Sequence, residues 1–155
     1  TAEKYFAEKE KILRRKTKQT YAIGNADDRH QSDFVCQSWY GSDTKKSDFT
    51  MTDIHEFPDR TEFTLLHGNE KYFIVTPILG QHHAGLLAGA FMVALQMDIP
   101  ALDIVSFLRH IHLPHARGNT LKGLHDSLVI DGTYNGGFDP IVAGVEMLAR
   151  LAQTE

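Results

Sequence analysis

Histidine is the residue type whose number and spacing most suggest chemistry in this chain. Nine histidines occur in 155 residues; His110, His112 and His115 form an H-x-H-x-x-H cluster, and His82 and His83 are adjacent. Imidazoles at this spacing could share a metal ion if the chain leaves its helix within the cluster. No neighbouring cysteine or glutamate completes a known ligand set, so a polar helix end is the favoured interpretation and a histidine metal site the alternative.

Other catalytic signatures are missing from the sequence. It contains no G-x-x-x-x-G-K-[ST] phosphate loop, no nucleophile elbow and no zinc-protease motif. The chain therefore cannot cradle a triphosphate by a phosphate loop of its own.

Composition and charge restrict the class of protein. Apolar residues make up 42% and charged residues 23%, which is typical of a globular chain. The single Cys36 excludes an internal disulfide and fits a reducing compartment. The net charge of −4 argues against nucleic acid as a partner, and no apolar run approaches the ~20 residues of a membrane span. We therefore expect a cytoplasmic protein with neither a nucleic-acid nor a membrane partner.

The first eighteen residues are strongly basic. They hold seven lysines and arginines against three glutamates, a local charge of +4. Such a run is most often a solvated helix face, and a surface that faces phosphate is the alternative.

The hydrophobic pattern predicts a mixed α/β order. Alternating residues predict three strands in an antiparallel meander, and Ala- and Leu-rich segments predict packed helices after it. The predicted helices are 2–16, 28–37, 82–97, 101–111 and 140–151, the strands are 20–23, 49–54, 61–66 and 71–75, a hairpin joins 121–124 to 127–130, and 39–47 is a loop. A domain boundary is expected near Pro114.

Three segments match one family in order and spacing. They are Asn25-Ala26-Asp27-Asp28 after a strand, Gly80-Gln81-His82-His83 at the start of an Ala-rich helix, and Arg117-Gly118-Asn119 followed by the run from Val129 to Asn135. The chain resembles the Mur ligase family over essentially its whole length. The resemblance is closest to the MurF-like type, which adds D-alanyl-D-alanine to a UDP-N-acetylmuramoyl-tripeptide.

The resemblance implies a particular domain organisation. Residues 1–114 would be the later half of the central ATPase domain, with a small antiparallel three-stranded sheet and packed helices. Residues 115–155 would begin a Rossmann-like C-terminal domain. Because family members are about three times as long, and because Thr1 is not an initiator, we expect a fragment whose phosphate loop would precede it.

The resemblance also assigns roles to individual residues. Lys9 would be the family's carbamylated lysine, a catalytic residue and a ligand of magnesium, because carbamylation gives it carboxylate-like oxygens. Arg117 would reach the γ-phosphate of ATP as a second catalytic residue. Asp131 would lie near the nucleotide ribose. The complete set of implied cofactor-binding residues is Asn25, Asp27, Asp28, His82, His83, Arg117, Asp131, Tyr134 and Asn135.

Several positions depart from the family pattern. The two asparagines that family members use at the adenine are His83 and Leu86 here. The glycine before the conserved arginine is Ala116, and the second aspartate of the later motif is Gly132. Because leucine cannot hydrogen-bond a base, we expect neither ATP nor magnesium to bind tightly to this chain alone.

The function implied is that of part of an ATP-dependent ligase of peptidoglycan precursor synthesis. In such an enzyme the substrate carboxylate becomes an acyl phosphate, from which the amine displaces phosphate. The parent's partners would be a UDP-N-acetylmuramoyl-peptide and an amino acid or dipeptide, and the chain alone is expected to be inactive. The alternative is a degenerate Mur-like binding or assembly module without catalysis.

A truncated second domain would leave apolar side chains uncovered. We therefore expect self-association into a homo-oligomer through faces that carry Val129, Ile130, Val142, Val145, Met147 and Leu148.

Overall fold

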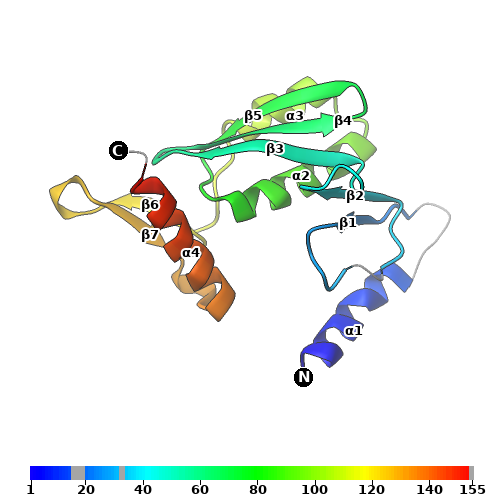
Figure 1. Ribbon diagram of the computed structural model, residues 1–155, viewed down its shortest axis with the longest axis horizontal. Helices are drawn as coiled ribbons and strands as arrows, with labels where there is room; N and C mark the ends of the chain where they lie inside the picture. The colour runs from blue at the N-terminus through cyan, green and yellow to red at the C-terminus, as the bar shows by residue number, and fades with distance from the viewer. Residues whose placement is uncertain (15–19, 32–33, 154–155) are drawn as a thin grey trace.

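The computed structural model describes residues 1–14, 20–31 and 34–153. A five-stranded sheet with two helices packed on it forms the larger part (Figure 1). Helix α1 (Ala2–Arg14) lies beyond one end of this sheet, and a hairpin with helix α4 (Phe138–Leu151) lies toward the other end. Among the described helices none is long and apolar enough to span a membrane.

The sheet is mixed, with strand order β1-β2-β3-β4-β5. Strands β1 (Ile23–Asn25), β2 (Ser38–Gly41) and β3 (Phe49–Glu56) run parallel. Strands β4 (Thr61–His67) and β5 (Glu70–Thr76) complete it as an antiparallel meander with β3. The predicted meander is therefore confirmed in β3 to β5.

The prediction of a three-stranded sheet was wrong because β1 and β2 join the meander. Both strands have four residues or fewer, too short to show a period-two pattern, and β2 falls in the predicted loop 39–47. Long-range pairing holds β2 in place, with Trp39 opposite Gly24 and Tyr40 opposite Phe49. Asp48 adds a tie, since its Oδ2 accepts the backbone N–H of Trp39 at 2.8 Å.

The helix predicted over 28–37 is absent from the described residues of that segment, which form turns. Asp28 accepts the backbone N–H of His30 through Oδ1 at 2.9 Å and the side-chain amide of Gln31 through Oδ2. Asn25 Oδ1 likewise accepts the N–H of Asp27 at 3.0 Å. These local side-chain bonds give the backbone an alternative to helical pairing.

Helices α2 (Gln81–Gln96) and α3 (Ala101–Leu108) pack on the sheet and close the core. Pro77 and Gly80 end the β5 connection before α2, and Pro100 precedes the first residue of α3, where its fixed φ favours a helix start. The largest fully buried core side chains are Phe63, Phe91, Leu65 and Ile74. Burial of this apolar face fixes the position at which α2 begins.

The last forty residues form a second, smaller unit. Strands β6 (Asn119–Lys122) and β7 (Leu128–Asp131) make an antiparallel hairpin, as predicted, and α4 follows. Met147 and Leu151 of α4 pack with Leu79, just before α2, in a small second core.

The expectation that Met147 and Ile130 lie on an uncovered face was therefore wrong, because Met147 is only 2% exposed and Ile130 is half-buried against the same core. Val129, Val142, Val145 and Leu148 are exposed, so self-association through them stays a prediction. The domain boundary near Pro114 likewise stays a prediction; it lies in the segment that joins α3 to β6.

Candidate functional site

Arg117, Asp131 and Tyr134 come together around the start of the hairpin. The guanidinium carbon of Arg117 lies over the Tyr134 ring, 4.2 Å from its centre. Two backbone bonds fix this arrangement: Tyr134 N–H donates to the Ala116 carbonyl at 3.0 Å, and Gly118 N–H donates to the Asp131 carbonyl at 2.7 Å. An exposed cation is therefore held against an exposed aromatic ring.

Asp131 ends β7 and stabilises the turn that follows. Its Oδ1 accepts the Thr133 hydroxyl at 2.7 Å and the Thr133 backbone N–H at 3.2 Å. These hydrogen bonds favour the carboxylate and hold the pKa of Asp131 below its usual value. The carboxylate thus fixes the turn that presents the Tyr134 ring.

The start of α2 carries two adjacent imidazoles whose ring planes are tilted by 42°. The ring centres of His82 and His83 are 4.1 Å apart, and His83 Nδ1 lies 2.6 Å from the Leu79 carbonyl. Gly80 precedes them with φ +105°, a conformation that L side chains rarely adopt. The Gly80 N–H donates to the Thr61 hydroxyl oxygen at 3.1 Å, which ties this turn to the sheet.

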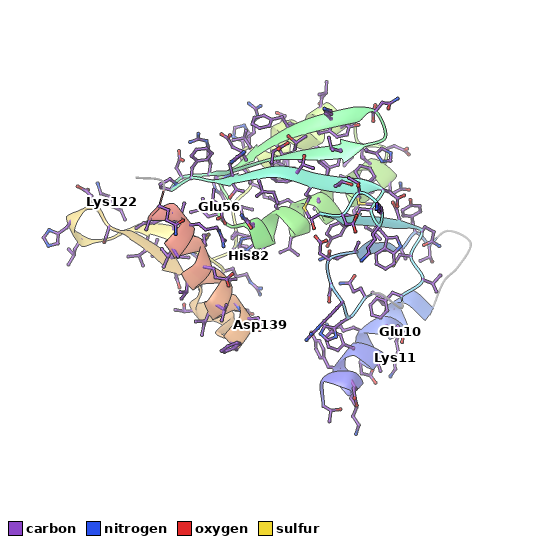
Figure 2. The ribbon with its side chains drawn as sticks, viewed as in Figure 1. Glu10, Lys11, Glu56, His82, Lys122 and Asp139 are labelled. Atoms are coloured by element: carbon purple, nitrogen blue, oxygen red, sulfur yellow. The ribbon has the colours of Figure 1, made fainter. Side chains whose placement is uncertain are left out.

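The hairpin and the start of α2 are neighbours. A Cβ atom on Gly118, whose φ is +95°, would lie 3.3 Å from His83 Cε1. The structure therefore places His83 next to the backbone that follows Arg117. We use the name junction for this region and its five predicted site residues: His82, His83, Arg117, Asp131 and Tyr134. Figure 2 shows His82 at the start of α2, close to Glu56.

The electrostatic surroundings of His82 favour its neutral form. Partial burial, His83 and Arg150 lower the pKa of His82 to about 4, and Glu56 opposes this shift. Part of the side chain is nevertheless exposed to solvent, which screens these charges.

We expect stability to fall on acidification because of this histidine. A neutral His82 stabilises the fold fully above its unfolded pKa near 6.5, and this contribution is lost as the pH falls toward about 4. His82→Gln should therefore flatten the decline in unfolding free energy between pH 6.5 and 4, by about 1 kcal/mol after allowance for solvent screening. Urea unfolding at several pH values measures this, with His112→Gln as the control; an unchanged slope in His82→Gln would contradict it.

Three of the other predicted cofactor residues, Asn25, Asp27 and Asp28, lie apart from the junction. Asp27, after β1, accepts the Ser42 backbone N–H at 3.0 Å and the Ser42 hydroxyl at 2.9 Å, and thereby fastens the loop after β2. Burial and the charges of Asp28 and Asp27 raise the pKa of Tyr40. Asn25 and Asp28 hold the turns described above, so in this chain all three have structural partners. Asn135 follows Tyr134 in a 3-10 turn.

Lys9 is exposed on α1, which lies apart from α4 and from the start of α2 (Figure 1). Its ammonium lies 5.3 Å from the centre of the Tyr5 ring, and α1 contacts the turn after β1 through the stacked rings of Phe6 and His30. Figure 2 shows the neighbouring Glu10 and Lys11 far from His82 and Glu56.

No metal site is assembled within the described residues. They contain no group of three or more His, Cys, Asp or Glu side chains that could hold a metal ion. His110, His112 and His115 are all exposed in the connection after α3 and do not converge. The polar-helix-end interpretation of this cluster is therefore the better one.

Sequence reasoning missed two residues beside the junction, Glu56 and Arg150. Arg150 donates to Glu56 through Nε and through Nη2, the latter at 3.1 Å from Oε1. The two residues are 94 positions apart, so no local motif could have paired them. The one available signal was that Glu56 ends a strand just before a Pro-containing turn.

A cavity of about 550 Å³ lies elsewhere, between the β6–β7 hairpin, the end of α4 and Pro58. Leucines such as Leu121, Leu148 and Leu151 line it, and it contains none of the predicted site residues. Its polar lining residues are Thr120, Lys122, Asp126 and Ser127, and Lys122 and Asp126 already form an ion pair with each other. We therefore place the candidate site at the junction, where the predicted residues lie.

Comparison with known proteins identifies the family. Residues 1–94, well over half of the chain, match the family described as the Mur ligase middle domain. The chain belongs to the Mur ligase family.

Among its relatives is UDP-N-acetylmuramoyl-tripeptide–D-alanyl-D-alanine ligase of Escherichia coli strain K12, which is 31% identical over 115 residues, covering 72% of this chain and 25% of the relative. MurF from Acinetobacter baumannii has a similar structure, with a TM-score of 0.79 and 23% identity over 92% of this chain and 32% of that one. MurF from Thermotoga maritima, solved in complex with ADP, is also similar in structure, with a TM-score of 0.78. Its sequence identity is 16%, and the match covers 97% of this chain and 35% of that one. The chain is thus MurF-like, and it spans about a quarter to a third of the length of these relatives.

Proposed function

We propose that this chain supplies part of the nucleotide site of an ATP-dependent, amide-bond-forming ligase of peptidoglycan precursor synthesis. The observation that supports this most is the Arg117 guanidinium held over Tyr134 beside the start of α2. The substrates of the complete enzyme would be a UDP-N-acetylmuramoyl-peptide and an amino acid or dipeptide. The MurF-like relatives favour the dipeptide D-alanyl-D-alanine.

The junction fits a nucleotide chemically. Arg117 is exposed, and a guanidinium offers paired N–H donors that match phosphate oxygens. Tyr134 is 62% exposed and presents a ring on which a base can stack. Asp131 stays ionised and can accept a hydrogen bond from a ribose hydroxyl.

Each residue of the junction would have its own part in the reaction. A bound ATP would supply the phosphoryl group that activates the substrate carboxylate. Arg117 would hold the γ-phosphoryl group as it passes to the carboxylate, with ADP as the leaving group, and would stabilise the negative charge on it. Tyr134 and Asp131 would orient the nucleoside, and neutral His82 would add no positive charge at the start of α2.

The magnesium assignment does not fit the described residues in the same way. Lys9 is exposed, and its ammonium lies over the Tyr5 ring. In the described part of the chain, no three carboxylates or other metal-binding side chains gather around it. The role of Lys9 as a carbamylated magnesium ligand stays a prediction from the resemblance, and no step is assigned to the metal.

Nucleotide binding by the isolated chain tests the proposal. Because the sequence contains no phosphate loop, we expect ADP to bind weakly, at about 1 mM. Arg117→Ala should weaken binding about tenfold or more, since one charge-assisted hydrogen bond contributes about 1.5–3 kcal/mol. Saturation-transfer NMR on the ADP protons measures this. Arg109→Ala, which removes an exposed arginine at the end of α3, is the control and should bind like wild type.

Two outcomes would contradict the proposal. One is an absence of ADP binding at ADP concentrations up to about 10 mM, tenfold above the expected dissociation constant. The other is equal weakening by Arg117→Ala and Arg109→Ala. Phosphate release with the peptide substrate and D-alanyl-D-alanine should not occur with the chain alone, and its detection would contradict the expected inactivity.

Specific observations favour the alternative of a binding or assembly module. Leu86 is 64% exposed on α2 and cannot hydrogen-bond a base. In addition, the Gln81 N–H at the start of α2 already donates to Glu56 Oε1 at 2.8 Å, so this N–H is not available to a phosphate oxygen. A failure to bind ADP, with the fold intact, would support this alternative.

A further inference from the structure

One carboxylate connects three elements that are distant in the sequence. Glu56, the last residue of β3, has a side chain that is only 4% exposed. It forms a two-point ion pair with Arg150 in the last turn of α4, whose side chain is 37% exposed. The same carboxylate accepts the backbone N–H of Gln81, the first residue of α2. Figure 2 shows Glu56 between the end of α4 and His82.

The Gln81 bond gives Glu56 the role of a helix cap from outside the helix. The residue before α2, Gly80, makes no capping bond with a side chain because it has none. The first N–H groups of a helix need acceptors, and a negative charge is favoured at this end. Glu56 therefore stabilises the start of α2 and attracts Arg150 to the same point.

A small apolar cluster accompanies the ion pair. Met147, one turn before Arg150, and Leu151, directly after it, pack on Leu79, two positions before Gln81. The contact between α4 and the start of α2 thus has an apolar part and an ionic part. The ionic part can open without unfolding, because the Arg150 guanidinium is reachable by water while Glu56 keeps the Gln81 bond.

We propose that Glu56 and Arg150 form a latch that holds the β6–β7–α4 unit on the start of α2 and thereby sets the spacing of the nucleotide junction. Arg117 and Tyr134 belong to this unit, whereas His82 and His83 belong to α2, so the latch fixes one half of the junction against the other. Both residues act as positioning residues. The link to a nucleotide rests on the proposed function, but the latch itself does not.

Native-state hydrogen exchange on the full chain tests the latch without any ligand. Arg150→Met keeps an unbranched side chain of similar reach but removes the guanidinium, which donates two hydrogen bonds to Glu56. We expect backbone amides of α4 and of β6–β7 to exchange at least tenfold faster in this variant, while core amides such as those of Phe63 and Ile74 keep their protection. Glu56→Gln should also accelerate α4, and the double variant should be no faster than the faster single variant, since both remove one interaction.

A matched control comes from a second arginine–carboxylate pair. Arg60 donates to Glu62 through Nε at 2.7 Å, and both residues belong to the meander of β3 to β5. Arg60→Met should leave exchange in α4 unchanged, and Arg150→Lys, which keeps the charge but not the guanidinium, should fall between wild type and Arg150→Met. The latch is refuted if Arg150→Met leaves α4 as protected as wild type. It is also refuted if core and α4 amides lose protection together, because the pair would then stabilise the whole fold without a specific positioning role.

ADP binding gives the second readout. Arg150→Met should weaken ADP binding at least threefold, although Arg150 is not placed in contact with the nucleotide, and Arg60→Met should not. If ADP fails to bind wild type, the proposed function is wrong and the exchange data alone decide the latch. If ADP binds wild type and Arg150→Met equally, the latch does not set the junction.

Discussion

Phe91→Ala is expected to lower the free energy of unfolding by about 3–5 kcal/mol, the range typical of a deleted core phenylalanine. The Phe91 side chain is fully buried on α2. Its ring centre lies 5.0 Å from that of Tyr72 and 6.4 Å from that of Phe49, so it joins α2 to both β5 and β3. Urea unfolding followed by circular dichroism measures the loss.

The matched control is Phe73→Ala on β5. Phe73 is 54% exposed, so its removal should change the unfolding free energy by less than about 0.5 kcal/mol. Equal losses in the two variants would show that α2 is not held by the core face described here. Because α2 presents His82 and His83, a displaced helix would also disturb the junction.

Gly80→Ala is the second large effect, because it acts on the turn that starts α2. At φ +105° an L residue is strained, which costs about 1–3 kcal/mol. The new Cβ would also lie 2.5 Å from His82 Cε1 and 3.1 Å from Met147 Sδ. We therefore expect a loss of at least about 2 kcal/mol in unfolding free energy, together with displacement of the His82 ring, visible in its NMR resonances.

Gly144→Ala is expected to change the free energy of unfolding in the opposite direction. Gly144 lies within α4, and no atom outside its own helix lies within 4 Å of the position that its Cβ would take. Alanine there should stabilise the chain by about 0.5–1 kcal/mol, because glycine is the poorer helix former. If Gly80→Ala were as harmless as Gly144→Ala, the turn before α2 would not have the conformation described.

Much of the fold follows from local pattern. The strands β3 to β5 are seven or eight residues long and rich in apolar and β-branched residues, and α2 has a long Ala- and Leu-rich run, so their existence and type are predicted correctly. The strand predicted over 20–23 overlaps β1 at Ile23 only, and a loop is predicted at β2, since both strands are short and depend on partners elsewhere in the chain. The false helix over 28–37 arose because Asp28 resembles a helix cap but instead closes a turn.

In the candidate site, too, some residues follow from local motifs and others from contacts between distant parts of the chain. Arg117, Asp131 and Tyr134 belong to short motifs, so the family resemblance indicates them from the sequence alone. The closeness of their segment to His83 depends on Gly118 and on the packing of α4, which only the fold supplies. Glu56 and Arg150 could not be found from sequence, because their ion pair spans 94 positions.

The central claim is that the start of α2 and the Arg117–Tyr134 segment form one nucleotide site. The most direct test is a residue-resolved map of amide chemical shifts in the isotope-labelled chain during titration with ADP. The account predicts the largest shifts at His82, His83, Gly118 and Tyr134, with no comparable shifts in α1 or at the leucines of the apolar cavity. Shifts confined to that cavity or to α1, with the junction unchanged, would contradict it.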